Sequence, residues 1–157
     1  MMKLARISMR GTAIALGIMA GSLLAEAMIL VPFWQEMAGE EFLRWYAMNA
    51  ARLLNYFGPL EVMAALLAIT AAIATRRLEH DAAPIMLAVA MLSLATLLPF
   101  FVYFSEANAS FADASVPLTD LPQELLRWER WHWARTLIAV VAFLCAVVAP
   151  IESRDKS

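Results

Sequence analysis

Cysteine and histidine are scarce in this sequence, and their scarcity excludes several kinds of function. The one cysteine, Cys145, lies within an apolar run, so the chain forms no internal disulfide and has no Cys-x-x-Cys motif for thiol redox chemistry. The two histidines are His132 and His80, and we expect His80, in Arg-Arg-Leu-Glu-His-Asp, to be an exposed turn residue. The topology inferred below places them on opposite sides of a membrane, so a haem held by two histidines of one chain is not expected.

Charge is also sparse in this chain. Charged residues make up 17% of it, the net charge is −2 and no dense basic run occurs, so the composition does not favour a nucleic-acid partner. Hydrophobic residues make up 62%, and the mean hydropathy is +0.67. Soluble domains average about 45–50% apolar residues, so this composition indicates an integral membrane protein whose partner is the lipid bilayer. Residues 1–157 are expected to form a single domain.

Four apolar segments approach the length of about 20 residues that a transmembrane helix needs. They predict an all-α fold, a four-helix transmembrane bundle. Pro32 and Pro99 lie near the ends of the first and third spans and predict bends there, because each proline removes a backbone donor. The approximate bounds of the spans are residues 11–34, 57–75, 83–104 and 131–149.

The basic residues orient these spans. Most of them lie before the first span, between the second and third spans, or in the C-terminal tail, and the positive-inside rule places such segments in the cytoplasm. We therefore expect a multi-pass protein of the cytoplasmic membrane with both termini in the cytoplasm and two long outer connections, residues 35–56 and 105–130. The basic residues on the cytoplasmic side would be Lys3, Arg6, Arg10, Arg76, Arg77, Arg154 and Lys156.

The first span has a second interpretation. Its basic start, its apolar stretch and Ala25-Glu26-Ala27 also resemble a signal peptide with a cleavage site. Apolar residues continue from there to Trp34, however, and the total is long enough to span, so we expect the first helix to be retained.

The first outer connection also carries a helical pattern. Trp45, Asn49, Arg52 and Tyr56 recur at helical spacing, with apolar residues between them. This pattern predicts an amphipathic interfacial helix between the first and second spans.

The apolar spans contain a few ionisable residues, and all of them fall in the outer half. Glu26 lies in the first span, Glu61 about one turn into the second, and His132 and Arg135 near the start of the fourth. Charges at this depth are costly unless they are paired or face a polar cavity. We therefore expect Arg135 within salt-bridge reach of Glu61 or Glu26, with His132 lining the same cavity. Glu106, at the end of the third span, is the weakest member of the set.

This set has three interpretations. The charges could form a structural ion pair that fixes helix register. Alternatively, crowded carboxylates share a proton near neutral pH and serve acid–base chemistry, which makes His132, Arg135, Glu61 and Glu26 catalytic residues without a metal. Two glutamates and a histidine are also acceptable metal ligands.

The residues around the charges are equally open to two interpretations. Tyr103, Trp128 and Trp131 either wall a pocket or belong to an interfacial aromatic belt. Rows of alanines follow Glu61 and Arg135 along their helices, and they either allow tight helix packing or leave room for an apolar ligand. These rows are Ala64, Ala65, Ala68 and Ala72, and Ala139, Ala142 and Ala146.

Four short spans, Asn108 shortly after the third span, and Trp128-x-x-Trp131-His132-x-x-Arg135 opening the fourth resemble the anthrone-oxygenase-like family of small integral membrane proteins. The resemblance covers nearly the whole chain, and the Trp-x-x-Trp-[His/Asn]-x-x-Arg pattern is its most specific part. Fungal members are implicated in oxidising anthrones to anthraquinones without a bound metal or flavin. The resemblance implies site roles for Asn108, Trp131, His132 and Arg135 and no cofactor, but it does not specify the substrate.

Together these features predict an oxygenase-like or related redox enzyme that acts on a lipophilic, aromatic or quinone-like small molecule in an outer-leaflet pocket. His132 or a glutamate would remove an acidic C–H or phenolic proton, and Arg135 would stabilise the anion, which then meets oxygen directly. The alternative is a non-enzymatic membrane protein, a small carrier or an accessory subunit. In that case the buried charges pair between helices or with a partner chain.

Overall fold

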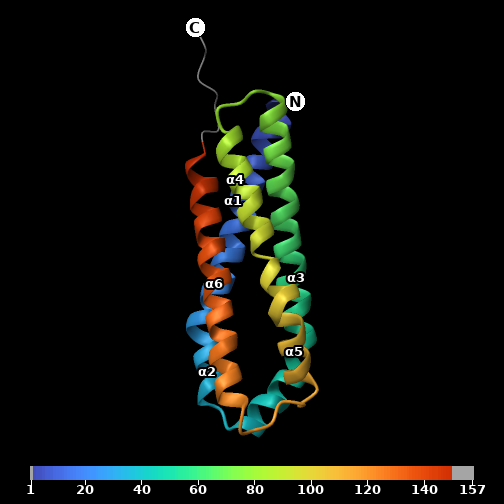
Figure 1. Ribbon diagram of the computed structural model, residues 1–157. Helices are drawn as coiled ribbons and strands as arrows, with labels where there is room; N and C mark the ends of the chain where they lie inside the picture. The colour runs from blue at the N-terminus through green and yellow to red at the C-terminus, as the bar shows by residue number, and fades with distance from the viewer. Residues whose placement is uncertain (1, 150–157) are drawn as a thin grey trace.

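The computed structural model describes residues 2–149, which form an elongated bundle of four long helical segments (Figure 1). Short connections join successive segments, which therefore run in alternating directions. No strand occurs among the described residues. The first segment comprises α1 (Met2–Ala25), the π-helical turn η1 (Glu26–Leu30) and α2 (Val31–Glu36); the second is α3 (Gly39–Arg77); the third comprises α4 (Ala83–Ala95), η2 (Phe100–Phe104, also π-helical) and α5 (Ser105–Ala112); and the fourth is α6 (Leu121–Val148).

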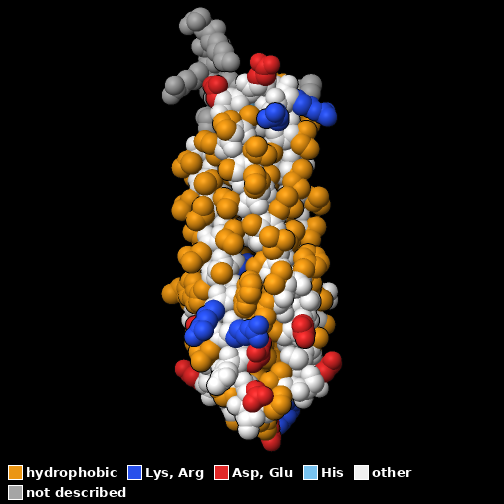
Figure 2. Space-filling model, in the orientation of Figure 1, with side chains coloured by type: hydrophobic (Ala, Val, Ile, Leu, Met, Phe, Trp, Pro, Cys, Tyr) orange, Lys and Arg blue, Asp and Glu red, His pale blue; other side chains and the backbone are white. Residues whose placement is uncertain are grey.

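All four segments are long and apolar enough to cross a membrane, which confirms the predicted all-α four-helix bundle and a multi-pass membrane protein. Figure 2 shows hydrophobic side chains covering most of the length of the visible face, with charged side chains gathered toward the two ends. We call the end that carries the α2–α3 and α5–α6 connections the predicted outer end. Of the basic residues expected in the cytoplasm, Arg154 and Lys156 lie outside the described residues.

The segment predicted as a separate interfacial helix is helical, but it is the first part of α3, which runs unbroken from Gly39 to Arg77 with Pro59 inside it. Part of its apolar face is buried inside the bundle. Phe42 and Tyr46 are buried and pack against Trp34 of α2 and Phe111 of α5. This aromatic packing makes the segment a wall of the bundle.

The rows of alanines pack tightly. Ala64, Ala68, Ala139 and Ala142 are all fully buried within one core in the half of the bundle away from the predicted outer end. Small side chains allow helices to approach closely in a membrane. The rows therefore hold the helices together there, and none of these alanines lines the cavity described below.

Each predicted proline bend adjoins a π-helical turn. In η1 the backbone N–H of Val31 bonds the carbonyl of Glu26, and Pro32 follows directly. In η2 the N–H of Ser105 bonds the carbonyl of Phe100, and Pro99 immediately precedes the turn. The wider turn accommodates a proline, which lacks a donor and whose ring clashes with the preceding turn of an ordinary helix. Glu26 and Phe100 therefore both lie in a locally widened turn of a helix.

His80 corrects one expectation. Rather than being an exposed turn residue, it is only 2% exposed. Its Nδ1 accepts a hydrogen bond from the backbone N–H of Ala82 at 3.1 Å, which folds the ring back under the α3–α4 connection.

Candidate functional site

Arg135 of α6 lies at the centre of a buried polar cluster, as the sequence predicted. Its Nη1 donates a hydrogen bond to Glu61 Oε1 at 3.0 Å, and its Nη2 lies 3.7 Å from Glu26 Oε2. All three side chains are buried, at 6% exposure or less. The guanidinium also lies over the ring of Phe104, 4.5 Å from its centroid. Residues from each of the other three segments therefore meet at the Arg135 guanidinium.

His132 lies behind Arg135, one turn earlier on α6, and is fully buried. Its Nε2 is 3.0 Å from the carbonyl oxygen of Leu23, and its Nδ1 is 3.0 Å from Arg135 Nη2. A carbonyl only accepts hydrogen bonds and a guanidinium only donates them, so Nε2 carries the proton and Nδ1 accepts. Both ring nitrogens are therefore engaged in the neutral imidazole, which fixes the orientation of the Arg135 side chain.

Glu26 is the least satisfied member of the cluster. Its Oε2 is buried and has no hydrogen-bond partner among the described residues, although it lies 3.7 Å from both Arg135 Nη2 and His132 Nδ1. With Glu61 paired directly to Arg135 and His132 neutral, Glu26 is the carboxyl group in excess. A buried polar atom without a partner is costly in a protein interior, so its position calls for an explanation.

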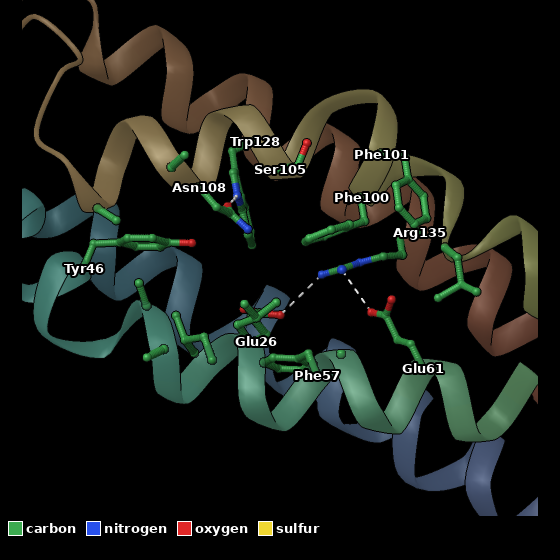
Figure 3. A pocket seen from close by; sticks show the side chains of 18 of the residues that line it. Glu26, Tyr46, Phe57, Glu61, Phe100, Phe101, Ser105, Asn108, Trp128 and Arg135 are labelled. Carbon is green, nitrogen blue, oxygen red and sulfur yellow. Dashed lines mark hydrogen bonds and ion pairs between the residues drawn. The ribbon is translucent and has the colours of Figure 1, made fainter.

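Glu26 also faces a cavity of about 490 Å³ that lies between the first part of α3, the η2–α5 part of the third segment, and α6. In Figure 3 Arg135 and Glu61 lie at one end of this cavity, Tyr46 at the other, and Glu26 along the side between them. A volume of this size is typical of small-molecule sites. The lining is mostly apolar: Ala50, Ala51, Leu53, Leu54, Phe57, Gly58, Val62, Leu97, Phe100, Phe101, Ala109 and Ala112, with the polar or ionisable residues Glu26, Tyr46, Glu61, Ser105, Asn108, Trp128 and Arg135.

Asn108 and Trp128, two of the predicted ligand-binding residues, belong to this lining. The indole Nε1 of Trp128 donates a hydrogen bond to Asn108 Oδ1 at 2.8 Å, and the indole ring stacks on His132 with ring centroids 5.0 Å apart. Trp128 thus joins the buried polar cluster to the cavity wall. Because Asn108 uses its oxygen for Trp128, its amide nitrogen is left for another partner.

Tyr103 and Trp131, the other two predicted binding residues, lie outside the cavity lining. Their rings stack on each other at 5.6 Å, and the Tyr103 hydroxyl donates a hydrogen bond to Glu124 Oε1 at 2.7 Å. Arg127 lies over the Tyr103 ring at 5.2 Å. This second aromatic group links the third segment to α6 on a different face of the bundle from the cavity. The sequence spacing therefore predicted the correct helices for Tyr103 and Trp131 but not their position relative to the cavity. His132 is likewise not part of the lining.

Tyr46, Phe57 and Phe100 line the cavity but were not singled out from the sequence. Tyr46 and Phe57, with Leu53 between them, lie at helical spacing on α3. The pattern was therefore present, but it lies about a quarter turn of the helix away from the more polar face on which the predicted interfacial helix was based. Phe100 had no comparable signal, because its direction depends on the π-helical turn.

Glu129 and His132 have the Glu-x-x-His spacing that occurs in di-iron bundles. The two side chains do not converge here, because the Glu129 carboxylate accepts a hydrogen bond from Gln35 at 2.8 Å on the exposed side of α6. No group of three or more His, Cys, Asp or Glu side chains arranged to hold a metal occurs within residues 2–149.

No protein-family model matches this chain, and neither a curated protein nor a solved structure matches it.

Proposed function

We propose that the cavity binds a lipophilic small molecule and that Glu26 exchanges a proton with it. The observation that carries this proposal is the buried Glu26 Oε2, which has no hydrogen-bond partner among the described residues and belongs to a side chain that lines a largely apolar cavity of about 490 Å³. A ligand with an acidic proton would supply the missing partner. Perturbed or unsatisfied ionisable groups in such a pocket are candidates for acid–base work.

Glu26 is a better base than His132. Both nitrogens of His132 are engaged, by Leu23 and by Arg135, and its ring does not line the cavity. His132 is instead a positioning residue for the guanidinium. Arg135 lies beside Glu26 and lines the cavity, so it would stabilise an anion that forms when the ligand loses its proton.

The reaction that we propose is oxygenase-like, and its support is the resemblance of the Trp128 to Arg135 stretch to the anthrone-oxygenase-like family. Glu26 removes a proton from an activated CH₂ group, and the resulting carbanion forms a bond to molecular oxygen. Protonation of the peroxide and loss of water leave a ketone, so R₂CH₂ and O₂ become R₂C=O and H₂O. The chain's own residues supply the base, the anion stabilisation and a pocket that excludes water.

For location, we propose the cytoplasmic membrane with the cavity in the outer half. The support is the placement of Lys3, Arg6, Arg10, Arg76 and Arg77 at the end of the bundle opposite the cavity.

A specific observation favours the alternative of a structural cluster in a non-enzymatic protein. Arg135 is already bonded to Glu61 and His132, so it needs no ligand to be satisfied at its two terminal nitrogens. On that interpretation Glu26 serves only as a second carboxylate beside the cation. The two functions differ in what happens when Glu26 is neutralised.

The test is oxygen uptake and ketone formation by the purified protein in lipid nanodiscs, with anthrone as the probe and protein-free nanodiscs as the background. A general base contributes about 10²–10⁴-fold, so Glu26→Gln should lower the rate above background by at least about 100-fold. Glu106→Gln is the matched control, because Glu106 is exposed and does not line the cavity. A wild-type protein that binds anthrone without accelerating its oxidation contradicts the enzyme proposal, as does full activity of Glu26→Gln.

A further inference from the structure

The cavity has a closed side and an open side. On the closed side, η1 and α6 contribute Glu26, Trp128 and Arg135, which are 3–6% exposed. Every exposed residue of the lining belongs instead to α3 or to the η2–α5 part of the third segment; among them Val62 is 48% exposed and Phe101 is 75% exposed. The opening therefore lies between α3 and the third segment, which run side by side in this half of the bundle (Figure 1).

On the α3 side, the rim of this opening is apolar at Val62, which suits the hydrocarbon of a membrane. Val62 lies ten residues after Arg52 on α3, which is about 15 Å along the helix axis. Between these two residues the only charged side chain is Glu61, and it is buried. The next exposed positions on α3, Met63 and Leu66, are apolar as well. A molecule that enters at Val62 therefore passes an apolar rim, as entry from the lipid requires.

The charges at the cavity decide what kind of molecule fits. Glu26 and Glu61 face one cation, Arg135, so the two carboxylates would repel an anionic ligand. A ligand with a fixed positive charge would lie close to the guanidinium and be repelled by it. A neutral hydroxyl group can donate a hydrogen bond to the Glu26 carboxylate, which lines the cavity, without adding charge.

The same hydroxyl can also accept a hydrogen bond. The Tyr46 hydroxyl lines the cavity, and so does the Asn108 amide nitrogen, whose neighbouring oxygen is used by Trp128. Neither group has a hydrogen bond to another described residue, and Figure 3 shows both side chains directed into the cavity. Apolar residues, including Phe57 and Phe100, surround these polar groups and suit a hydrocarbon body.

We infer that the cavity takes up a neutral, hydroxyl-bearing amphiphile that is dissolved in the bilayer, through a lateral portal between Val62 of α3 and Phe101 of η2. The inference rests on the proposed function for its choice of site, but it does not depend on any oxidation. The hydroxyl group meets Glu26, and the hydrocarbon body lies along the apolar wall and toward the portal.

The first test compares two ligands. 4-Decylphenol and its methyl ether are partitioned between protein-containing and protein-free phosphatidylcholine vesicles, and the bound fraction of each is measured by mass spectrometry. Hydrogen bonds to charged groups contribute enough that the phenol should bind about tenfold or more tightly than the ether. Equal affinities would overturn the assignment of a hydroxyl donor to Glu26.

The second test concerns the portal. Val62→Trp adds bulk at the rim, and Met63→Trp is the matched control, because Met63 is the next residue on α3, is 51% exposed and does not line the cavity. Exchange between bound and bilayer-dissolved probe is followed by ¹⁹F NMR with a fluorinated 4-decylphenol. Val62→Trp should slow exchange severalfold and Met63→Trp should not; equal rates in the two variants overturn lateral entry.

These results are distinguishable from a failure of the proposed function. Selective binding of the phenol with slowed exchange in Val62→Trp supports the portal even if anthrone is not oxidised. Oxidation of anthrone together with equal exchange in the two tryptophan variants supports the enzyme and overturns the portal.

Discussion

At the scale of single residues, Arg135 holds the polar cluster together. It contacts Glu61, Glu26 and His132, so its removal leaves two buried carboxyl groups without their cation. We expect Arg135→Ala to lower the free energy of unfolding by about 3–5 kcal/mol, the usual effect of breaking a buried pair. Thermal or denaturant unfolding in detergent measures this change.

The control for this prediction is a double-mutant cycle. Replacing both Arg135 and Glu61 by leucine should lower the free energy of unfolding by less than the sum of the two single changes, because in the double variant neither residue remains as a charge without its partner. Additive losses would contradict the direct pair.

His132 should behave as a structural support of Arg135. It is fully buried, bonds Leu23 and Arg135, and stacks on Trp128. His132→Ala removes two buried hydrogen bonds and leaves a cavity, so we expect a loss of about 2–4 kcal/mol in the free energy of unfolding. Chemical denaturation of the purified variant measures it. Wild-type stability together with lost ligand binding would instead indicate that His132 touches the ligand.

The residue scale also shows what sequence reasoning can and cannot find. The pairing of Arg135 with Glu61 and Glu26 was predictable, because intramembrane charges seek partners and alternating helix direction places these three at one level. The exclusion of Tyr103 and Trp131 from the cavity was not predictable, since small rotations of a helix decide which face an aromatic ring occupies.

At the scale of helices, Gly17 of α1 packs closely against Phe143 of α6. A Cβ at Gly17 would lie 3.0 Å from the Phe143 ring, whereas a Cβ at Gly21, one turn later, meets nothing within 4 Å. Alanine has the higher helix propensity at either position, by up to about 1 kcal/mol, so Gly21→Ala should be neutral or stabilising. Gly17→Ala should be less stable than Gly21→Ala by about 1–3 kcal/mol because of overpacking.

Melting temperatures of the two glycine variants in the same detergent measure this difference. Equal melting temperatures would mean that Phe143 moves aside without cost and that the helix contact is not tight at Gly17.

Helix lengths and ends were predictable only in part. The four spans follow from hydropathy alone, and the structure extends each of them at one or both ends. The sequence did not predict that α3 is one continuous helix, because the polar residues of its first part resemble those of an interfacial helix. The buried face of that part contacts aromatic residues that lie far away in the sequence. The π-helical turns were hidden for a related reason: Pro32 and Pro99 predict a bend, but not the widened turn that displays Glu26.

At the scale of the whole molecule, the charge distribution predicts orientation. Reporter fusions after Arg77 should read as cytoplasmic and fusions after Ala114 as external, because Arg76 and Arg77 directly precede the α3–α4 connection and the α5–α6 connection lies at the opposite end. An external reporter after Arg77 would reverse the orientation and place the cavity in the inner half of the membrane.

The two halves of the bundle are packed differently. Alanine-rich helices pack closely in one half, and an aromatic core and a cavity occupy the other. We propose that Arg135 and Glu61 stabilise the bundle, while Glu26 serves the ligand. That division can be tested with one variant, because glutamine has the shape of glutamate without its charge.

The measurement is the melting temperature of Glu26→Gln and of the wild-type protein in nanodiscs, with and without 4-decylphenol. Without ligand, the variant should melt at or above the wild-type temperature, because Arg135 keeps Glu61 and His132 and the carboxyl group in excess is gone. With ligand, wild type should be stabilised by mass action and the variant much less. A variant that melts several degrees lower without ligand, yet gains the full ligand shift, would contradict the account by making Glu26 a structural residue.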